Sequence, residues 1–398
     1  MENAISRFFD RELPIEKGIK IKVLDIVFWL GITFAAIVIR VLLYSIESRD
    51  YLDFLTEWYD AVDALPGFSA LGISVGNYNP PYMYLMKLMT LLPMRSLFAI
   101  KLFSNLFEFA AALLILRMVY GFYKNTFFAL GAYGIFLLAP TVVLNGSAWA
   151  QCDIIYSFFL LGCVCAFLKN RPLLASILFG VAFAFKLQAV FLAPLLLWLW
   201  VAGRVKFRHL LAIPAVFLAA LVPAWLAGRP FLELLTIYLH QAGDYSQSLT
   251  YNFPNLYTFF GNAYVSAVAK AAIFVTAAAV GLLIYLMLAT KAAPTMEAII
   301  TFSFFSAMLI PFFLPFMHDR YGFPADLLGL FYAFVRPKKF AAAVVFMMVS
   351  LVAYGPYLFG IEIMPMPFAT VGYLFCLCYV GADLVGQCLS NKQYVRNK

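Results

Sequence analysis

The chain has 398 residues, of which 64% are hydrophobic and only 12% are charged, and its net charge is +8. A soluble globular protein carries about 25% charged residues, so this composition excludes a soluble enzyme or binding module. The mean hydropathy of +0.90 and the apolar runs that recur along the whole chain predict an all-α polytopic membrane protein.

Twelve apolar runs have the length and composition of membrane-spanning helices, or nearly so. They cover 23–46, 97–122, 127–146, 152–168, 171–186, 187–203, 208–228, 263–289, 295–316, 320–335, 340–358 and 366–388. The two runs between 171 and 203 are shorter than a bilayer core requires. The sequence therefore predicts a bundle of about 12 transmembrane helices with no separate soluble domain.

The basic residues favour one orientation of this bundle. If the N-terminal segment 1–22 is cytoplasmic, the clusters "KNR", "GRVKFR" and "RPKK" all fall in inner loops, as the positive-inside rule requires. The outer loops then include 47–96, which has six acidic residues before Pro66, the short "NGSAWAQCD", the long 229–262 and "MHDRY". The positive charge is thus a topology signal and does not indicate a nucleic-acid partner. We expect an integral, multi-pass plasma membrane protein with both termini in the cytoplasm.

The first outer loop is expected to contain an amphipathic helix. Asp53, Glu57 and Asp60 share one face at helical spacing, and aromatic and aliphatic side chains share the other. These three acids are expected to face water while the helix rests on the membrane. Asp50 begins the pattern, next to the end of the first span, where it would be the N-cap.

Other ionisable side chains gather at the outer ends of the predicted spans. They are Asp153, Lys186 and the "HDRY" turn at 318–321. Charged groups in or near a bilayer are costly, so they are candidates for function. Their common side predicts a cavity open to the outside or to the outer leaflet. Lys186 could instead extend to the lipid headgroups, and His318 with Arg320 could be an interfacial anchor.

Two charged residues, Glu108 and Lys270, lie inside predicted spans. We expect them to pair with each other or to face the interior of the bundle.

Several motifs together resemble the GT-C glycosyltransferases, which are polytopic enzymes that use polyprenyl-phosphate sugars. The closest likeness is to prokaryotic mannosyltransferases related to the second mannosyltransferase of GPI-anchor synthesis. The motifs are "RDYLDFLTEW", "NYNPPYMYLM", "SAWAQCD" with the later "KLQ" turn, "YNFPNLY" and "MHDRYGFP". They cover roughly 23–335. The chain departs from the usual pattern at Asn79, Ala150, Cys152 and Asp319.

The resemblance implies an inverting transfer of a hexose, with mannose favoured, in which Asp50 is the catalytic base. A planar guanidinium and an ammonium are natural phosphate partners, so Arg320, His318 and Lys186 are candidates for binding the donor phosphate. The remaining candidates, for sugar or acceptor binding, are Asp153, Gln151, Trp149, Tyr78, Asn79, Gln188, Tyr321, Asn252 and Asn255. The polar segment 240–248 is expected to be a mobile lid.

The expected partners are the polyprenyl-phosphate sugar, the lipid bilayer and an acceptor glycan, glycolipid or protein. No cofactor is expected, although a divalent metal among Asp50, Asp153, Asp319 and His318 is an alternative. The chain is expected to form one integral membrane domain, with the catalytic module at 23–335 and C-terminal helices and a tail at 336–398. Two other functions stay open: a transporter or flippase of a lipid-linked glycan, and a lipid-linked polysaccharide polymerase or ligase.

Overall fold

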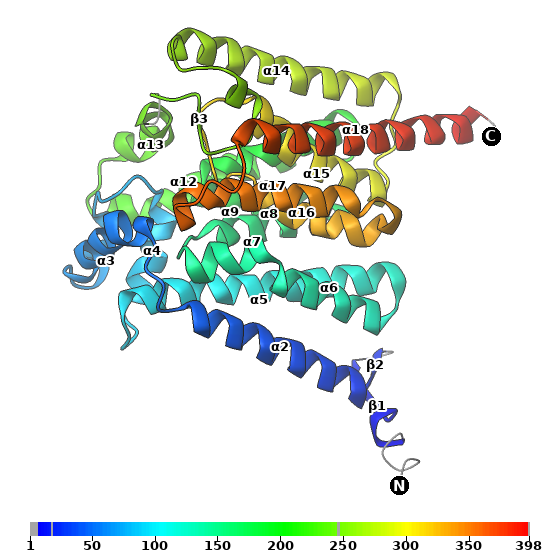
Figure 1. Ribbon diagram of the computed structural model, residues 1–398, viewed down its shortest axis with the longest axis horizontal. Helices are drawn as coiled ribbons and strands as arrows, with labels where there is room; N and C mark the ends of the chain where they lie inside the picture. The colour runs from blue at the N-terminus through cyan, green and yellow to red at the C-terminus, as the bar shows by residue number, and fades with distance from the viewer. Residues whose placement is uncertain (1–6, 17–18, 245–246, 397–398) are drawn as a thin grey trace.

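The computed structural model describes residues 7–16, 19–244 and 247–396 of the chain. Most of these residues are helical, and the long helices form one bundle (Figure 1). Within the described part, seven helical segments are long and apolar enough to cross a membrane. They are α2 (Val23–Leu43), α5 (Ser96–Tyr123), α11 (Phe207–Leu210) with α12 (Ala212–Leu226), α14 (Val265–Ala289), α15 (Met296–Phe313), α17 (Ala341–Tyr354) with η7 (Gly355–Phe359), and α18 (Met366–Arg396). The protein is therefore an all-α, multi-pass membrane protein, as predicted.

One further apolar run is broken in the middle. α6 (Thr126–Leu138) is followed by α7 (Pro140–Val143) and η3 (Leu144–Ala148), and the two parts are bent by 48°. Pro140 causes the break, because proline has no N–H to donate and disfavours a helical conformation in the residue before it. Ala139 accordingly has a ψ angle of 124°.

Four shorter apolar helices complete the bundle. They are α8 (Asp153–Leu168), α9 (Pro172–Phe185), η4 (Leu187–Leu192) with α10 (Ala193–Val201), and α16 (Phe323–Val335). Helices of this length rise about 20 to 24 Å, which is less than the roughly 30 Å of hydrocarbon in a bilayer. Helices form at each of the twelve predicted ranges, while the number of helices that cross the membrane stays a prediction.

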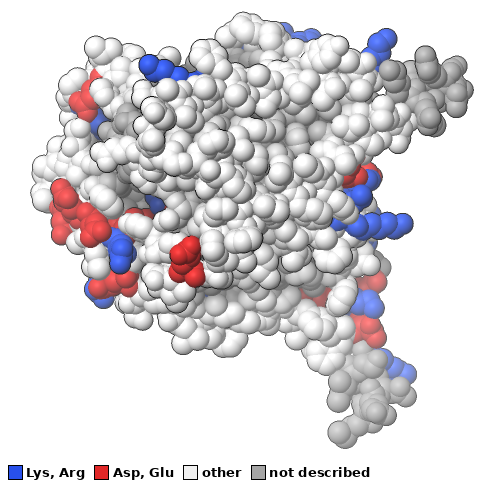
Figure 2. Space-filling view, turned by 45° about the horizontal axis from the view of Figure 1, so that its top comes forward, with Lys and Arg blue, Asp and Glu red and all other residues white. Residues whose placement is uncertain are grey.

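The first predicted outer loop is largely helical. It contains η1 (Tyr51–Leu55), α3 (Thr56–Asp63), η2 (Gly67–Gly72) and α4 (Pro80–Met89). Asp53, Glu57 and Asp60 are exposed, whereas Leu55 and Trp58 are buried, which confirms the amphipathic pattern. Figure 2 shows acidic side chains gathered at the end of the molecule where α3 lies. The start of α2 and the end of α18 both lie at the opposite end, on the right of Figure 1, but apart from each other.

The predicted N-cap role of Asp50 is wrong. Asp50 has helical dihedral angles, φ −58° and ψ −35°, and its side chain makes no capping hydrogen bond. Ser48 Oγ instead accepts a hydrogen bond of 3.2 Å from the backbone N–H of Tyr51. The helix therefore begins before Asp50, and the Asp50 carboxylate is available for other contacts.

The long predicted outer loop 229–262 also has regular structure. It contains α13 (Phe231–Asp244), β3 (Thr250–Tyr251) and η5 (Leu256–Phe259). β3 pairs in parallel with β4 (Met317–His318), so this loop is joined to the turn between α15 and α16. Tyr245 and Ser246 of the predicted lid lie outside the described residues. The remaining short elements are β1 (Glu12–Glu16), antiparallel to β2 (Ile19–Lys22), and η6 (Pro337–Lys339).

A buried ion pair joins α2 to α5. Arg40 Nε lies 2.7 Å from Glu108 Oε2, and their side chains are only 2% and 0% exposed. Arg40 also donates to the carbonyl oxygens of Ala36 and Leu137 at 3.0 Å each. The expected pairing of Glu108 with Lys270 is wrong, because Lys270 lies on an exposed face of α14, whereas Glu108 faces the bundle interior, as the alternative predicts.

We predict that Glu108→Leu strongly destabilises the protein. The substitution leaves the Arg40 guanidinium buried without its counter-charge, which costs about 3 to 5 kcal/mol. Thermal unfolding of the detergent-purified protein measures the effect. The double variant R40L/E108L should recover most of the lost stability, because two apolar side chains replace the pair.

The matched control is Asp10→Asn, which removes the Lys22–Asp10 ion pair, whose side chains are 50% and 58% exposed. Exposed pairs contribute about 0 to 1 kcal/mol, so this variant should melt like the wild type. An E108L variant as stable as D10N would contradict the importance of the buried pair.

Candidate functional site

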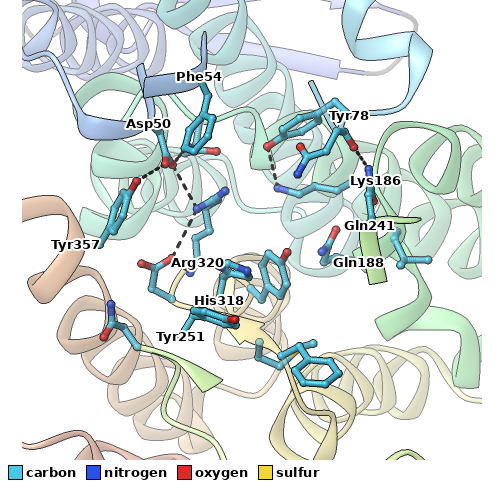
Figure 3. Close-up of a pocket in the computed structure, with 18 of the residues that line it drawn as sticks. Asp50, Phe54, Tyr78, Lys186, Gln188, Gln241, Tyr251, His318, Arg320 and Tyr357 are labelled. Carbon is cyan, nitrogen blue, oxygen red and sulfur yellow. Dashed lines mark hydrogen bonds and ion pairs between the residues drawn. The ribbon is translucent and has the colours of Figure 1, made fainter. Parts of the chain in front are cut away.

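A cavity of about 570 Å³ lies at the end of the bundle that carries α3 and α13. Its wall is built from the first outer loop, the end of α9, the segment after α13, the turn between α15 and α16, and η7 (Figure 3). Nine of the predicted site residues line it: Asp50, Tyr78, Gln151, Lys186, Gln188, Asn252, His318, Arg320 and Tyr321. The prediction that polar residues from distant spans converge on one cavity is confirmed.

Asp50 is held by donors on both of its carboxylate oxygens. Oδ2 accepts hydrogen bonds from Trp149 Nε1 at 3.0 Å and from Gln151 Nε2, and Arg320 Nη1 lies 3.3 Å away. Oδ1 accepts a hydrogen bond of 2.7 Å from the Tyr357 hydroxyl. The side chain is only 10% exposed, so these contacts fix the direction in which it faces the cavity.

The backbone between η3 and α8 explains how two residues of one short segment reach Asp50. Ala150, between Trp149 and Gln151, has a φ angle of +63°. This left-handed conformation costs a residue with a Cβ about 1 to 2 kcal/mol. The turn directs the indole and the amide on either side of Ala150 at the same carboxylate oxygen.

Asp153 contacts both cations of the site, Lys186 and Arg320. It is the first residue of α8 and is 1% exposed. Its Oδ1 pairs with Lys186 Nζ, and its Oδ2 accepts a hydrogen bond of 3.0 Å from Asn145 and lies 3.6 Å from Arg320 Nε. Asp153 does not line the cavity, so its role is to position Lys186 and Arg320.

Lys186 is buried, which excludes the alternative that it extends to the lipid headgroups. α9 ends where Lys186 adopts an extended backbone, with φ −154° and ψ 135°. Its ammonium group lies 5.3 to 5.8 Å from the ring centroids of Tyr78, Tyr156 and Tyr321, which is cation–π distance.

The pKa values of His318 and Asp319 are both shifted toward the neutral form of the side chain. Burial, together with nearby Arg320 and Lys186, lowers the pKa of His318 to about 3, so its imidazole is neutral at pH 7. The ring stacks on Tyr251 with centroids 4.7 Å apart. His318 is therefore not a third cation for a phosphate, although it lines the cavity. Burial raises the pKa of Asp319 to about 7 against the attraction of Arg320.

Besides Asp153, three other predicted sugar or acceptor residues lie behind the cavity wall or away from it. Trp149 is completely buried and holds Asp50. Asn79 Nδ2 donates to the Ala184 carbonyl oxygen at 2.8 Å. Asn255 caps η5 by accepting from the Tyr257 N–H at 3.1 Å and donates to the Leu314 carbonyl oxygen at 3.2 Å. These two asparagines hold the backbone and do not line the cavity.

The structure also adds residues that the sequence did not single out. Phe54, Asn77, Gln241, Tyr251 and Tyr357 line the cavity. Tyr251 belongs to the motif "YNFPNLY", whereas the sequence marks Gln241 only by its place in the polar segment 240–248. Tyr357 lies beyond 335, so the site draws on the C-terminal helices as well as on the expected catalytic module.

The acidic residues of the site are paired with a cation rather than grouped around a metal position. Over the described residues, no group of three or more His, Cys, Asp or Glu side chains is arranged to hold a metal ion. Asp50, Asp153 and Asp319 each lie within 3.3 to 3.7 Å of Arg320.

Comparison of the sequence with models of protein families and with curated proteins finds no match.

We predict that Asp319 makes stability fall as the pH rises toward neutrality. Its pKa is raised from 3.8 to about 7 in the folded protein, so the folded state holds the proton where the unfolded chain has lost it. This contribution is complete at low pH and is lost as the pH rises through about 7. Asp319→Asn removes the titrating carboxyl group, so the stability of this variant should lack this dependence on pH.

Melting temperatures of wild type and D319N, measured from pH 5 to pH 8, test this. The melting temperature of D319N relative to that of the wild type should rise up to about pH 7 and level off above it. A difference that is constant across the range would contradict the buried, protonated Asp319.

Proposed function

We propose that the protein is a glycosyltransferase that moves a hexose, most simply mannose, from a polyprenyl-phosphate donor to an acceptor hydroxyl with inversion. The observation that carries the proposal is that the carboxylate of Asp50 faces the same cavity as two cations, Arg320 and Lys186. A base for a hydroxyl and cations for a phosphate are the two groups that this reaction needs. The motif resemblance supports the same choice of reaction.

In the proposed reaction the acceptor oxygen attacks the anomeric carbon of the donor. The bond from this carbon to the phosphate oxygen breaks, and the electron pair goes to the phosphate. The proton of the acceptor hydroxyl passes to Asp50. Arg320 and Lys186 stabilise the charge that grows on the leaving phosphate. A phosphate needs no acid to leave, so one carboxylate is sufficient.

The neutral part of the cavity wall suits a sugar. Gln188, Asn252, Tyr78 and Tyr321 line it and offer amide and phenol groups for sugar hydroxyls. The acceptor is expected to be a glycan, a glycolipid or a protein.

A lipid-linked donor is supported by the apolar side of the cavity. Leu314, Phe316 and Met317 line it, together with Ile273 of α14. Ile273 is 52% exposed, and α14 is long and apolar enough to cross the membrane. The cavity therefore borders a surface that bilayer lipid would cover, and a polyprenyl chain could lie there while its phosphate meets the cations.

The topology that we propose has twelve crossings, both termini in the cytoplasm and the cavity at the outer face of the plasma membrane. The basic loops support this orientation. Nucleotide sugars are cytosolic, so a lipid-linked sugar is the donor available on the outer side.

We predict that Asp50→Asn lowers kcat by about 10²- to 10⁴-fold, the usual contribution of a general base. The assay is transfer from polyprenyl-phosphate mannose to membrane-extracted acceptors by protein in nanodiscs. Asp53→Asn is the matched control, because Asp53 lies three residues further along the same loop and is exposed. Full activity in D50N would eliminate the base assignment. If the wild type moves lipid-linked glycans across the bilayer without any transfer, a flippase is favoured instead.

We predict that Arg320→Lys raises the KM for the donor about 10-fold. Lysine keeps the positive charge but loses the planar, two-pronged donor geometry that suits phosphate. Donor titrations at saturating acceptor measure the effect, and the acceptor KM should change much less. An unchanged donor KM would remove Arg320 from the phosphate site.

A further inference from the structure

Tyr357 connects the C-terminal helices to the candidate base. It lies in η7, the turn that follows α17, and its hydroxyl donates to Asp50 Oδ1 at 2.7 Å (Figure 3). Its ring stacks on Trp149 with centroids 5.8 Å apart and an interplanar angle of 22°. Trp149 itself donates to the other oxygen of Asp50. The two aromatic residues therefore hold the carboxylate from both sides.

The backbone around Tyr357 is tightly constrained. The N–H of Ile361 donates to the carbonyl oxygen of Gly355 at 3.1 Å, which closes the turn. A Cβ at Gly355 would lie 2.6 Å from the Ile361 carbonyl oxygen, so only glycine fits there. Gly360 ends the turn with a φ angle of +66°. This local geometry fixes the direction of the Tyr357 side chain.

The two oxygens of Asp50 differ in the number of donors they meet. An ionised carboxylate has about two lone-pair sites on each oxygen. Oδ2 meets Trp149, Gln151 and Arg320, which more than fill its sites. Oδ1 meets Tyr357 alone among the described residues. One lone pair of Oδ1 is therefore left for a ligand in the cavity.

We infer that Tyr357 is a positioning residue that orients Asp50 so that Oδ1 receives the proton of the acceptor hydroxyl. The inference rests on the proposed glycosyl transfer. In that step the O–H bond of the acceptor breaks and its proton joins Oδ1, while the oxygen bonds to the anomeric carbon. Tyr357 keeps its own proton throughout, and its hydrogen bond stabilises the charged form of the base before the transfer.

Other charged groups surround Asp50: Arg320 contacts it directly, Asp319 and Asp153 contact Arg320, and Lys186 pairs with Asp153. Arg320 and Asp319 come from the turn between α15 and α16, Asp153 from α8, and Lys186 from the end of α9. A useful variant must leave all four unchanged. Tyr357→Phe does so, because it removes one hydroxyl and keeps the ring on Trp149.

The matched control is Tyr354→Phe. Tyr354 is the last residue of α17, three residues before Tyr357. Its ring packs edge-on against Trp149, with centroids 5.0 Å apart. Its buried hydroxyl lies beside the Asn145 side chain, and no hydrogen bond joins it to Asp50 among the described residues. Both variants lose one hydroxyl from the same region, but only Y357F loses a donor to Asp50.

The first measurement does not depend on catalysis. Dicyclohexylcarbodiimide reacts with protonated carboxyl groups, so its labelling of the Asp50 peptide, followed by mass spectrometry across pH, reports protonation. We expect the labelling midpoint in Y357F to move up by about one to two pH units, the size of one hydrogen bond to a charged group. The midpoint in Y354F should match the wild type. No shift in Y357F, or an equal shift in both variants, overturns the inference.

The second measurement is transfer from polyprenyl-phosphate mannose as a function of pH. In Y357F the acidic limb of the kcat profile should move up by the same amount, while the donor KM stays within about twofold. A loss of activity with an unmoved acidic limb would indicate a merely structural role and would overturn the inference. If the wild type transfers no sugar at all, the proposed function fails, and the labelling still decides whether Tyr357 controls the protonation of Asp50.

Discussion

The structure of the site depends on Arg320, whose guanidinium lies between three aspartate side chains. Nη1 is 3.3 Å from Asp50 and 3.7 Å from Asp319, and Nε is 3.6 Å from Asp153. Charges in a largely apolar bundle are tolerated only when they are paired. Arg320 therefore brings together the first outer loop, α8 and the turn before α16. Lys186 extends the same arrangement by pairing with Asp153.

This pairing has a consequence for any anionic ligand. A phosphate that enters the cavity competes with carboxylates that already occupy both cations. The cations are pre-oriented by these carboxylates, so binding does not require them to be ordered from a disordered state. The near-neutral balance of charges also limits how strongly the site attracts anions that do not fit it.

Much of the fold and part of the site could be predicted because a membrane restricts the possibilities. Apolar length identifies helices, and charged residues at the ends of apolar runs tend to share one surface. This logic is sufficient to bring Asp50, Lys186 and Arg320 together. The same logic does not determine which side chains contact each other, because that depends on how each helix is rotated and where it breaks.

Glu108 therefore pairs with Arg40 and not with Lys270, and Asn79 and Asn255 bind backbone atoms and do not line the cavity. The sequence does not mark Tyr357 as a site residue, because tyrosine is common near membrane interfaces.

The shortness of α16 bears on the depth at which chemistry takes place. Its 13 residues rise about 20 Å, roughly 10 Å less than the hydrocarbon core. A helix with this hydrophobic mismatch draws water and headgroups inward or thins the surrounding leaflet. Arg320, three residues before α16, would then meet a lipid phosphate at the depth where the lipid already resides. The proposed polyprenyl-linked donor would then not have to be lifted out of the bilayer, and the cost of extracting its isoprenoid units would not enter the reaction barrier.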